Sequence, residues 1–158
     1  MDCTNGQFGR TDINILVVTV ILTGVGLPIC WQVLPKTTKL GNSHKAHRIC
    51  LMKNVLTLLA PGEIRVLTMD REFIGKKWLS WLHFLEVHYV VRVKKNTVIG
   101  SWSVSHLCAY GRWKKQACHL HEVFGQQVYF AAKRVAKGRN PFLAVISYGF
   151  SGHEALGL

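Results

Sequence analysis

Asp70 is the residue best placed to do chemistry. It follows Ile64–Met69, a short apolar run interrupted only by Arg65 and Thr68. Such a run predicts a buried strand, and open α/β sheets place their chemistry at the carboxyl ends of their strands. Asp2 is the second candidate. Two carboxylates that met at one end of a sheet would offer the hard oxygen ligands that Mg²⁺ and Mn²⁺ prefer.

A pair of divalent ions held in this way activates a water or hydroxyl and stabilises the leaving oxygen in phosphoryl transfer. Simpler roles stay open for both acids. Asp2 could be a frayed terminal residue, and Asp70 could cap the helix that follows it.

The charge of the chain favours a polyanionic partner. Its 158 residues carry 20 Lys and Arg against eight Asp and Glu, a formal net charge of +12 and a pI near 9.8. Nucleic acid and an anionic membrane surface would both fit, and charge alone does not choose between them. A hydrophobic content of 49% suits one globular domain.

The cysteines indicate free thiols in a reducing cytoplasm. Their number, five, is odd, and Met1-Asp2-Cys3 does not resemble a secretory leader. Cys108 and the Cys118–His121 segment raise the alternative of zinc. Because their spacing matches no usual finger or ribbon, structural thiols and surface histidines are the favoured interpretation.

The segment Ile13–Pro35 carries no charge and allows two interpretations. It is long enough for a membrane span. However, it is rich in β-branched residues and is interrupted by Thr23-Gly24-Val25-Gly26, a good turn. We therefore predict a hairpin with strands at 13–23 and 25–34.

The rest of the chain predicts an α/β domain. Ser43 is a possible N-cap for a helix, and strands are expected near 64–69, 88–93, 128–132 and 142–146. Strands that follow helices should lie parallel through right-handed crossovers. The first helix shows helical spacing at Ile49, Met52, Val55, Leu56 and Leu59, and the second, taken as core packing, at Ile74, Trp78, Trp81, Leu82 and Leu85.

Several segments resemble one known family. Met69–Leu79 and Phe84–Asn96 resemble the second-acid region of bacterial insertion-sequence transposases of the DDE class. Asp2–Asn5 with Phe8–Arg10 is similar to the family's first-acid segment, and Asn14–Trp31 to the hairpin that follows it. Gly41-Asn42-Ser43 also has a counterpart, and the segments occur in the family's order.

The resemblance implies a ribonuclease H-like mixed sheet with flanking helices and a β-rich insertion. It implies residues 1–96 as a partial catalytic core and 97–158 as the insertion with the start of the C-terminal part of the core. The family cuts DNA ends and joins them to a target with two divalent ions, Mg²⁺ or Mn²⁺. Asp2 would be the first acid and Asp70 the second, each both catalytic and a metal ligand.

The sequence departs from the family in places. Cys3 stands where the family often has Arg, and Gly6 where it has an aromatic residue. Only Met1 precedes Asp2, so the first strand is expected to be largely missing. The third acid of the family is a Glu on a later helix, and Glu154 falls too early to match it. We therefore expect a chain truncated at both ends and inactive alone.

The resemblance also suggests partners. DNA is expected as the ligand, together with a homodimer or an association with intact transposase, and no membrane. A non-catalytic DNA-binding or regulatory protein is the alternative, and a small membrane protein is less favoured. The proposed phosphate contacts, each of which could instead belong to a solvated basic face, are Arg10, Lys76, Arg92, Lys94 and Lys95.

Overall fold

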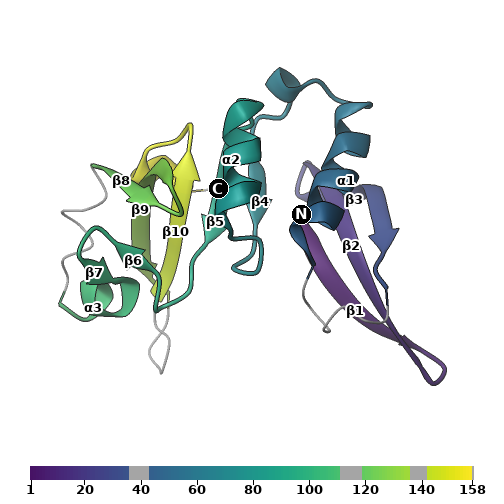
Figure 1. Cartoon of the computed structure of the whole chain (residues 1–158), viewed down its shortest axis with the longest axis horizontal. Coiled ribbons are helices and arrows are strands. Elements are labelled where there is room, and N and C mark those ends of the chain that lie inside the picture. The colour runs from purple at the N-terminus through teal and green to yellow at the C-terminus, as the bar shows by residue number, and fades with distance from the viewer. Residues whose placement is uncertain (36–42, 111–118, 136–141, 158) are drawn as a thin grey trace. The chain divides into compact units, whose positions relative to one another are not determined.

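A computed structural model describes residues 1–35, 43–110, 119–135 and 142–157. The chain divides into two compact units, residues 1–64 and 65–158. Each unit is described by itself (Figure 1).

The first unit is a three-stranded antiparallel meander with one helix. Its strands are β1 (Asp2–Phe8), β2 (Thr11–Leu22) and β3 (Val25–Val33), in the order β1-β2-β3. Leu22 pairs with Val25 across a two-residue turn, Thr23-Gly24, in which both residues have positive φ, 49° and 83°. This is the backbone of a type I′ hairpin turn, whose twist matches that of the strands.

The hairpin prediction is therefore confirmed, and a membrane helix at 13–35 is wrong. No helix among the described residues is long and apolar enough to cross a membrane. Strand β1 was not predicted, because its residues are mostly polar and carry no apolar alternation. It nevertheless pairs with β2 from Asp2↔Val17 to Phe8↔Thr11.

Helix α1 (Lys45–Leu56) packs on one face of this sheet and buries Leu51, Met52 and Val55 against it. The predicted N-cap is wrong: His44 is the N-cap, and it caps without a side-chain hydrogen bond. The buried Ser43 hydroxyl instead accepts a hydrogen bond at 2.9 Å from Nε of Arg48, which is also buried. An apolar pattern does not show that a buried arginine will compete for the capping hydroxyl.

The second unit is built on a five-stranded mixed sheet. After the 3₁₀ turn Pro61–Glu63, the elements are β4 (Leu67–Met69), α2 (Lys76–Phe84), β5 (Tyr89–Arg92), β6 (Val98–Ile99), β7 (Trp102–Ser103), α3 (Val104–Ala109), β8 (Leu120–Val123), β9 (Gln126–Arg134), β10 (Phe142–Tyr148) and α5 (Gly152–Ala155). The strand order in the sheet is β4-β5-β10-β9-β8. Strands β4 and β5 are parallel on either side of α2, as predicted, and the other pairs are antiparallel. Around α1 the crossover prediction is wrong, because β3 and β4 belong to separate sheets.

Helix α2 covers one face of the five-stranded sheet. Its Trp78, Leu79 and Leu82 are fully buried, and the Trp78 indole donates a hydrogen bond to Met69 Sδ at 3.4 Å. The Ser80 hydroxyl accepts a second hydrogen bond, at 2.7 Å, from the side-chain amide of Gln126 in β9. The prediction that this aromatic stripe is core packing is confirmed for its buried members.

The opposite face of the sheet is covered by the short α5. Val90, Ala131 and Val145 form a buried cluster there with Ala155 of α5. Both faces therefore carry helices, and the mixed α/β fold of the predicted class is confirmed. Strands β8, β9 and β10 join the same sheet as β4 and β5, while the predicted boundary at 96/97 stays a prediction.

Candidate functional site

Asp70 lies where the sequence predicted, directly after β4. The parallel register pairs Met69 with Val91, so the next residues along the two strands, Asp70 and Arg92, become neighbours. Arg92 Nη1 lies 3.3 Å from Asp70 Oδ1. Their side chains are 56% and 43% exposed, so this is an accessible ion pair at the carboxyl ends of two adjacent strands.

The turn after Asp70 holds the acid in place through buried neighbours. The Phe73 amide donates to the Asp70 carbonyl at 3.0 Å, and the Phe73 ring is fully buried. The Gly75 carbonyl then accepts from the Trp78 and Leu79 amides and starts α2. The acid is thus anchored at a strand end and a helix start.

The Asp70 carboxylate fits a divalent ion as one ligand. Its Oδ1 is buried and has no hydrogen-bond partner among the described residues, so the Arg92 contact is an ion pair without hydrogen-bond geometry. A buried carboxylate oxygen without a hydrogen bond is a hard donor that a divalent ion could bind. The residues that the structure describes contain no cluster of three or more His, Cys, Asp or Glu that could complete such a site.

Asp2 belongs to the other unit. It is exposed, it opens β1 instead of following a strand, and its Oδ1 accepts the Cys3 amide hydrogen at 2.8 Å. A lone acid in this setting is a candidate ligand by residue type only, so its role as first acid stays a prediction.

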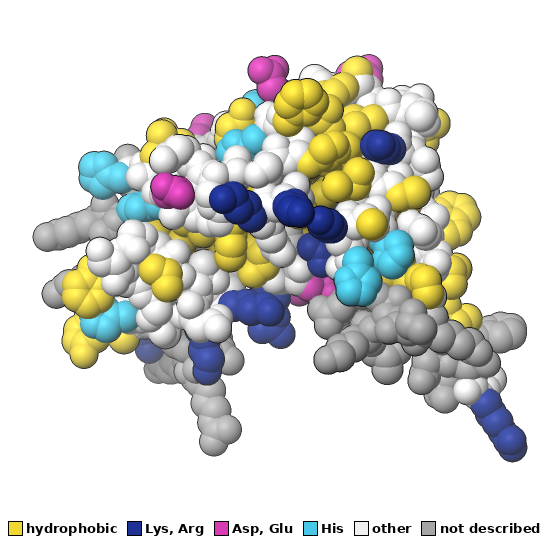
Figure 2. Space-filling view, in the orientation of Figure 1, with side chains coloured by type: hydrophobic (Ala, Val, Ile, Leu, Met, Phe, Trp, Pro, Cys, Tyr) yellow, Lys and Arg dark blue, Asp and Glu magenta, His cyan; other side chains and the backbone are white. Residues whose placement is uncertain are grey.

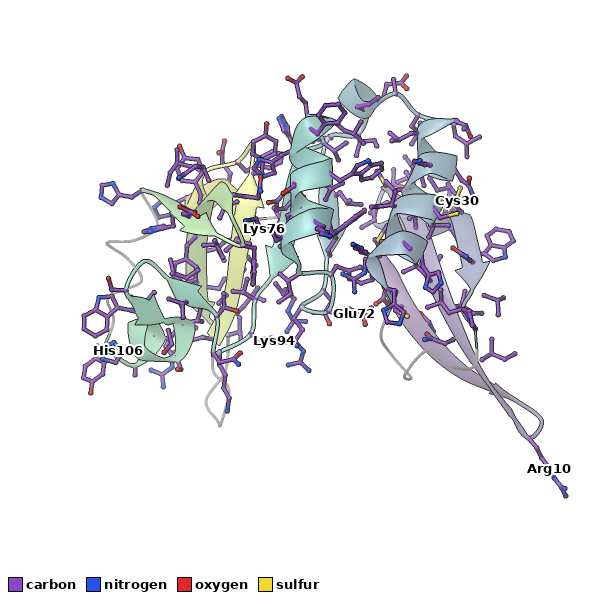
Figure 3. The ribbon with its side chains drawn as sticks, viewed as in Figure 1. Arg10, Cys30, Glu72, Lys76, Lys94 and His106 are labelled. Carbon is purple, nitrogen blue, oxygen red and sulfur yellow. The ribbon has the colours of Figure 1, made fainter. Side chains whose placement is uncertain are left out.

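Three of the predicted phosphate contacts follow one another at the end of β5. Arg92 ends that strand, and Lys94 and Lys95 are exposed on the turn beyond it. Lys76 starts α2, where its side chain passes close over Gly125: a Cβ there would lie 2.8 Å from Lys76 Cε. Arg10 projects from the tip of the β1–β2 hairpin (Figure 3).

Of these basic residues, Lys94 lines an open cavity of about 470 Å³ in the second unit. Lys94, Asn96 and Gly100 line it from one side, and Glu122 from β8 adds an acid. Apolar side chains, among them Ile74 and Phe124, also line the cavity, so its wall is part polar and part apolar.

A family model described as "Transposase DDE domain" matches residues 6–136. The chain belongs to this family. The match contains Asp70 and the five basic residues above, whereas Asp2 lies before it. No curated protein and no solved structure is matched. The family acts in transposition, a role that implies DNA binding, and it generally uses divalent metal ions.

The DDE domain also carries an aromatic cluster at the other end of β5, which sequence reasoning missed. His83 Nε2 and the Tyr89 hydroxyl share a hydrogen bond at 3.0 Å, and the His83 ring stacks on Tyr148 at 3.8 Å between centroids. Burial lowers the pKa of His83. Burial and the neighbouring Tyr148 hydroxyl raise the pKa of Tyr89. Because Tyr89 begins β5 and Arg92 ends it, this cluster lies away from Asp70 and stabilises α2 on the sheet.

A second aromatic group was also missed. Trp102, His106 and Tyr110 lie four residues apart, and that spacing is the one sequence signal that could have found them.

The zinc alternative involving Cys118 falls outside the described residues. Cys3, Cys30, Cys50 and Cys108 are free thiols.

Proposed function

We propose that Asp70 is a metal-binding catalytic acid in DNA strand cleavage and transfer. The observation that carries this proposal is the buried Asp70 Oδ1 at the carboxyl end of β4, which has an ion pair to Arg92 but no hydrogen-bond partner among the described residues. Bound Mg²⁺ or Mn²⁺ would supply an activated hydroxyl nucleophile and charge stabilisation at the leaving oxygen.

The basic residues of this chain would hold the DNA backbone. Arg92 orients the Asp70 carboxylate and presents the rest of its guanidinium to solvent, where a phosphate could accept from it. Arg10, Lys76, Lys94 and Lys95 are exposed cations that neutralise phosphates. The free thiols support action in the cytoplasm.

Glu154 does not serve as the third acid in this proposal. Its carboxylate accepts the Ser151 amide hydrogen at 2.8 Å and the Ser151 hydroxyl hydrogen at 2.7 Å, which together cap α5. These hydrogen bonds lower the pKa of Glu154. A capping role supports the expectation that this chain alone is inactive.

Binding of Mn²⁺ followed by electron paramagnetic resonance tests the metal ligand. The variant Asp70→Asn should lose binding, because an amide is a weaker ligand than a carboxylate and leaves Arg92 uncompensated. Glu86→Gln, which removes an exposed acid from the same unit, is the matched control and should bind as the unmodified chain does. Equal Mn²⁺ binding by Asp70→Asn and the unmodified chain would contradict the proposal.

Inactivity of the chain alone is tested by a nicking and strand-transfer assay on DNA with Mg²⁺. Product formed by the purified chain, and lost in Asp70→Asn, would show that the chain is an active enzyme and that this part of the proposal is wrong.

A non-catalytic DNA-binding or regulatory protein is the second candidate. The Arg92–Asp70 ion pair favours it, because a guanidinium already neutralises the acid. In that case Asp2→Asn and Asp70→Asn would both leave DNA affinity intact, and no metal-dependent cleavage would be found with any partner.

A further inference from the structure

We propose that Trp102, His106 and Tyr110, here called the ring column, form a stacking site for an unpaired nucleobase. The Trp102 and His106 ring centroids are 4.4 Å apart with an interplanar angle of 11°. The His106 and Tyr110 centroids are also 4.4 Å apart, at 39°. Three rings therefore follow one another, with His106 of α3 in the middle.

The outer side chains of the column are exposed to different degrees. Trp102 is 39% exposed and Tyr110 is 68% exposed. Figure 2 shows hydrophobic and histidine side chains together on the surface over β6, β7 and α3. A flat ring with an exposed face is the platform on which proteins stack bases of any sequence.

The column is not needed to hold α3 together. The buried side of α3 is formed by Val104, Leu107 and Cys108 instead. Its first turn is capped by Ser103, whose hydroxyl accepts the His106 amide hydrogen at 3.3 Å. The helix thus has a core and a cap of its own, and the rings lie on another side.

The same helix is tied to the basic turn after β5. The Ser105 amide donates to the Lys95 carbonyl at 2.8 Å, and the Val104 amide donates to the Thr97 carbonyl at 2.8 Å. Lys94 and Lys95 are exposed on that turn. One small module therefore offers cations for phosphates and stacked rings for a base, which is the combination used to bind single strands.

An unpaired base fits better than a paired one, because both faces of a base inside a duplex are already covered by its neighbours. This inference rests on the proposed function in one respect: it takes DNA as the polyanion. It adds that the DDE domain holds a single-stranded or frayed segment beside the site of Asp70, which the cleavage proposal does not require.

Fluorescence anisotropy with end-labelled strands tests the ring column. The probes are an oligo(dT) strand and a strand of equal length whose nucleotides are abasic, so that only the bases differ. The unmodified chain should bind oligo(dT) about tenfold more tightly than the abasic strand. The double variant W102L/Y110L should lose this difference, and Tyr110→Phe should keep it.

The matched control is Phe84→Leu, which removes an aromatic side chain that is 83% exposed elsewhere in the same unit. It should retain the difference between the two strands. If thermal melting shows that W102L/Y110L does not fold, Tyr110→Leu alone decides, because that side chain is the more exposed of the two.

Equal affinity of the unmodified chain for the two strands would overturn the stacking site, as would an undiminished difference in the column variants. If the column variants differ from the unmodified chain in molecular mass in solution but not in strand binding, the ring column is a contact between protein chains, and the stacking site is also overturned. Binding of the unmodified chain to blunt duplex DNA separates this proposal from the previous one. If the unmodified chain does not bind the duplex, the proposed function is contradicted. If it binds the duplex but does not distinguish the two single strands, the stacking site alone is contradicted.

Discussion

The Asp70 carboxylate and the Arg92 guanidinium connect the proposed metal ligand with the proposed phosphate contacts. Their 3.3 Å separation joins opposite charges that are both close to half exposed. Ion pairs as exposed as this one contribute little to stability, since solvent screens them. Arg92 is therefore expected to contribute more to the affinity for a ligand than to the stability of the fold.

Replacing Arg92 by Gln tests this division. The free energy of unfolding in urea should change by less than about 1 kcal/mol. The slope of log affinity for DNA against log salt concentration should become shallower by about 1, because one phosphate contact is lost. Arg65→Gln, an exposed arginine of the same unit, is the matched control. An equal loss of slope in both variants would show that Arg92 has no special place in DNA binding.

Single residues were predictable from the sequence where their position alone decides their role. Asp70 follows an apolar run, so its place at a strand end could be predicted. Its pairing with Arg92 could not, because that contact depends on the register between β4 and β5. Ser43 failed as an N-cap for a similar reason: its hydroxyl accepts from Arg48, a residue within α1 that no capping rule includes.

At the scale of elements, the β2–β3 turn contains a residue whose side chain disfavours the backbone conformation that it adopts. Thr23 has φ of 49°, a left-handed conformation that β-branched side chains disfavour. Gly24 follows it, so only one of the two turn residues is adapted to a type I′ turn.

The variant Thr23→Asn should therefore stabilise the chain, by roughly 0.5–1 kcal/mol, because asparagine tolerates the left-handed conformation. Urea unfolding would measure the change. Thr57→Asn is the control, since Thr57 also donates its hydroxyl to a nearby carbonyl but has φ of −78°. A gain of equal size at Thr57 would contradict the role of backbone strain.

Helix α2 should make the stability of the fold depend on pH through His83. Burial lowers the pKa of His83, so the unfolded chain takes up a proton more readily than the folded chain. The contribution of neutral His83 is complete above the unfolded pKa, near 6.5, and is lost as the pH falls through that value towards the folded one.

The variant His83→Asn should reduce the fall in unfolding free energy between pH 7 and pH 5. Urea unfolding at several pH values would show a shallower slope than in the unmodified chain. His153→Asn removes an exposed histidine from the same unit and serves for comparison. If both variants flatten the slope equally, burial of His83 is not the cause.

Elements with strong local patterns were predictable, and short or polar ones were not. The β-branched hairpin strands and the amphipathic α2 carry enough periodicity to identify them. Strands β6 and β7 have two residues each, too few for any alternation. Strand β1 is specified by its pairing with β2, and α3 by its contacts with the turn after β5.

For the whole molecule, the net charge of +12 leads to a prediction about salt. If all five proposed basic residues contact phosphates, log affinity for duplex DNA should fall against log salt with a slope of about −4.5. Anisotropy titrations across a range of KCl concentrations would measure it. A slope near zero would show that the charge does not serve DNA binding.

The sheet order of the second unit has a consequence for how the chain is made. Strand β10 lies between β5 and β9, although it is the last of these five strands to be synthesised. Until Phe142–Tyr148 has been synthesised, β5 and β9 each keep an open edge, and such edges pair readily with other chains. The meander β1-β2-β3 pairs only neighbours in the sequence and can form during synthesis, so assembly of the five-stranded sheet is expected to be the late and aggregation-sensitive step.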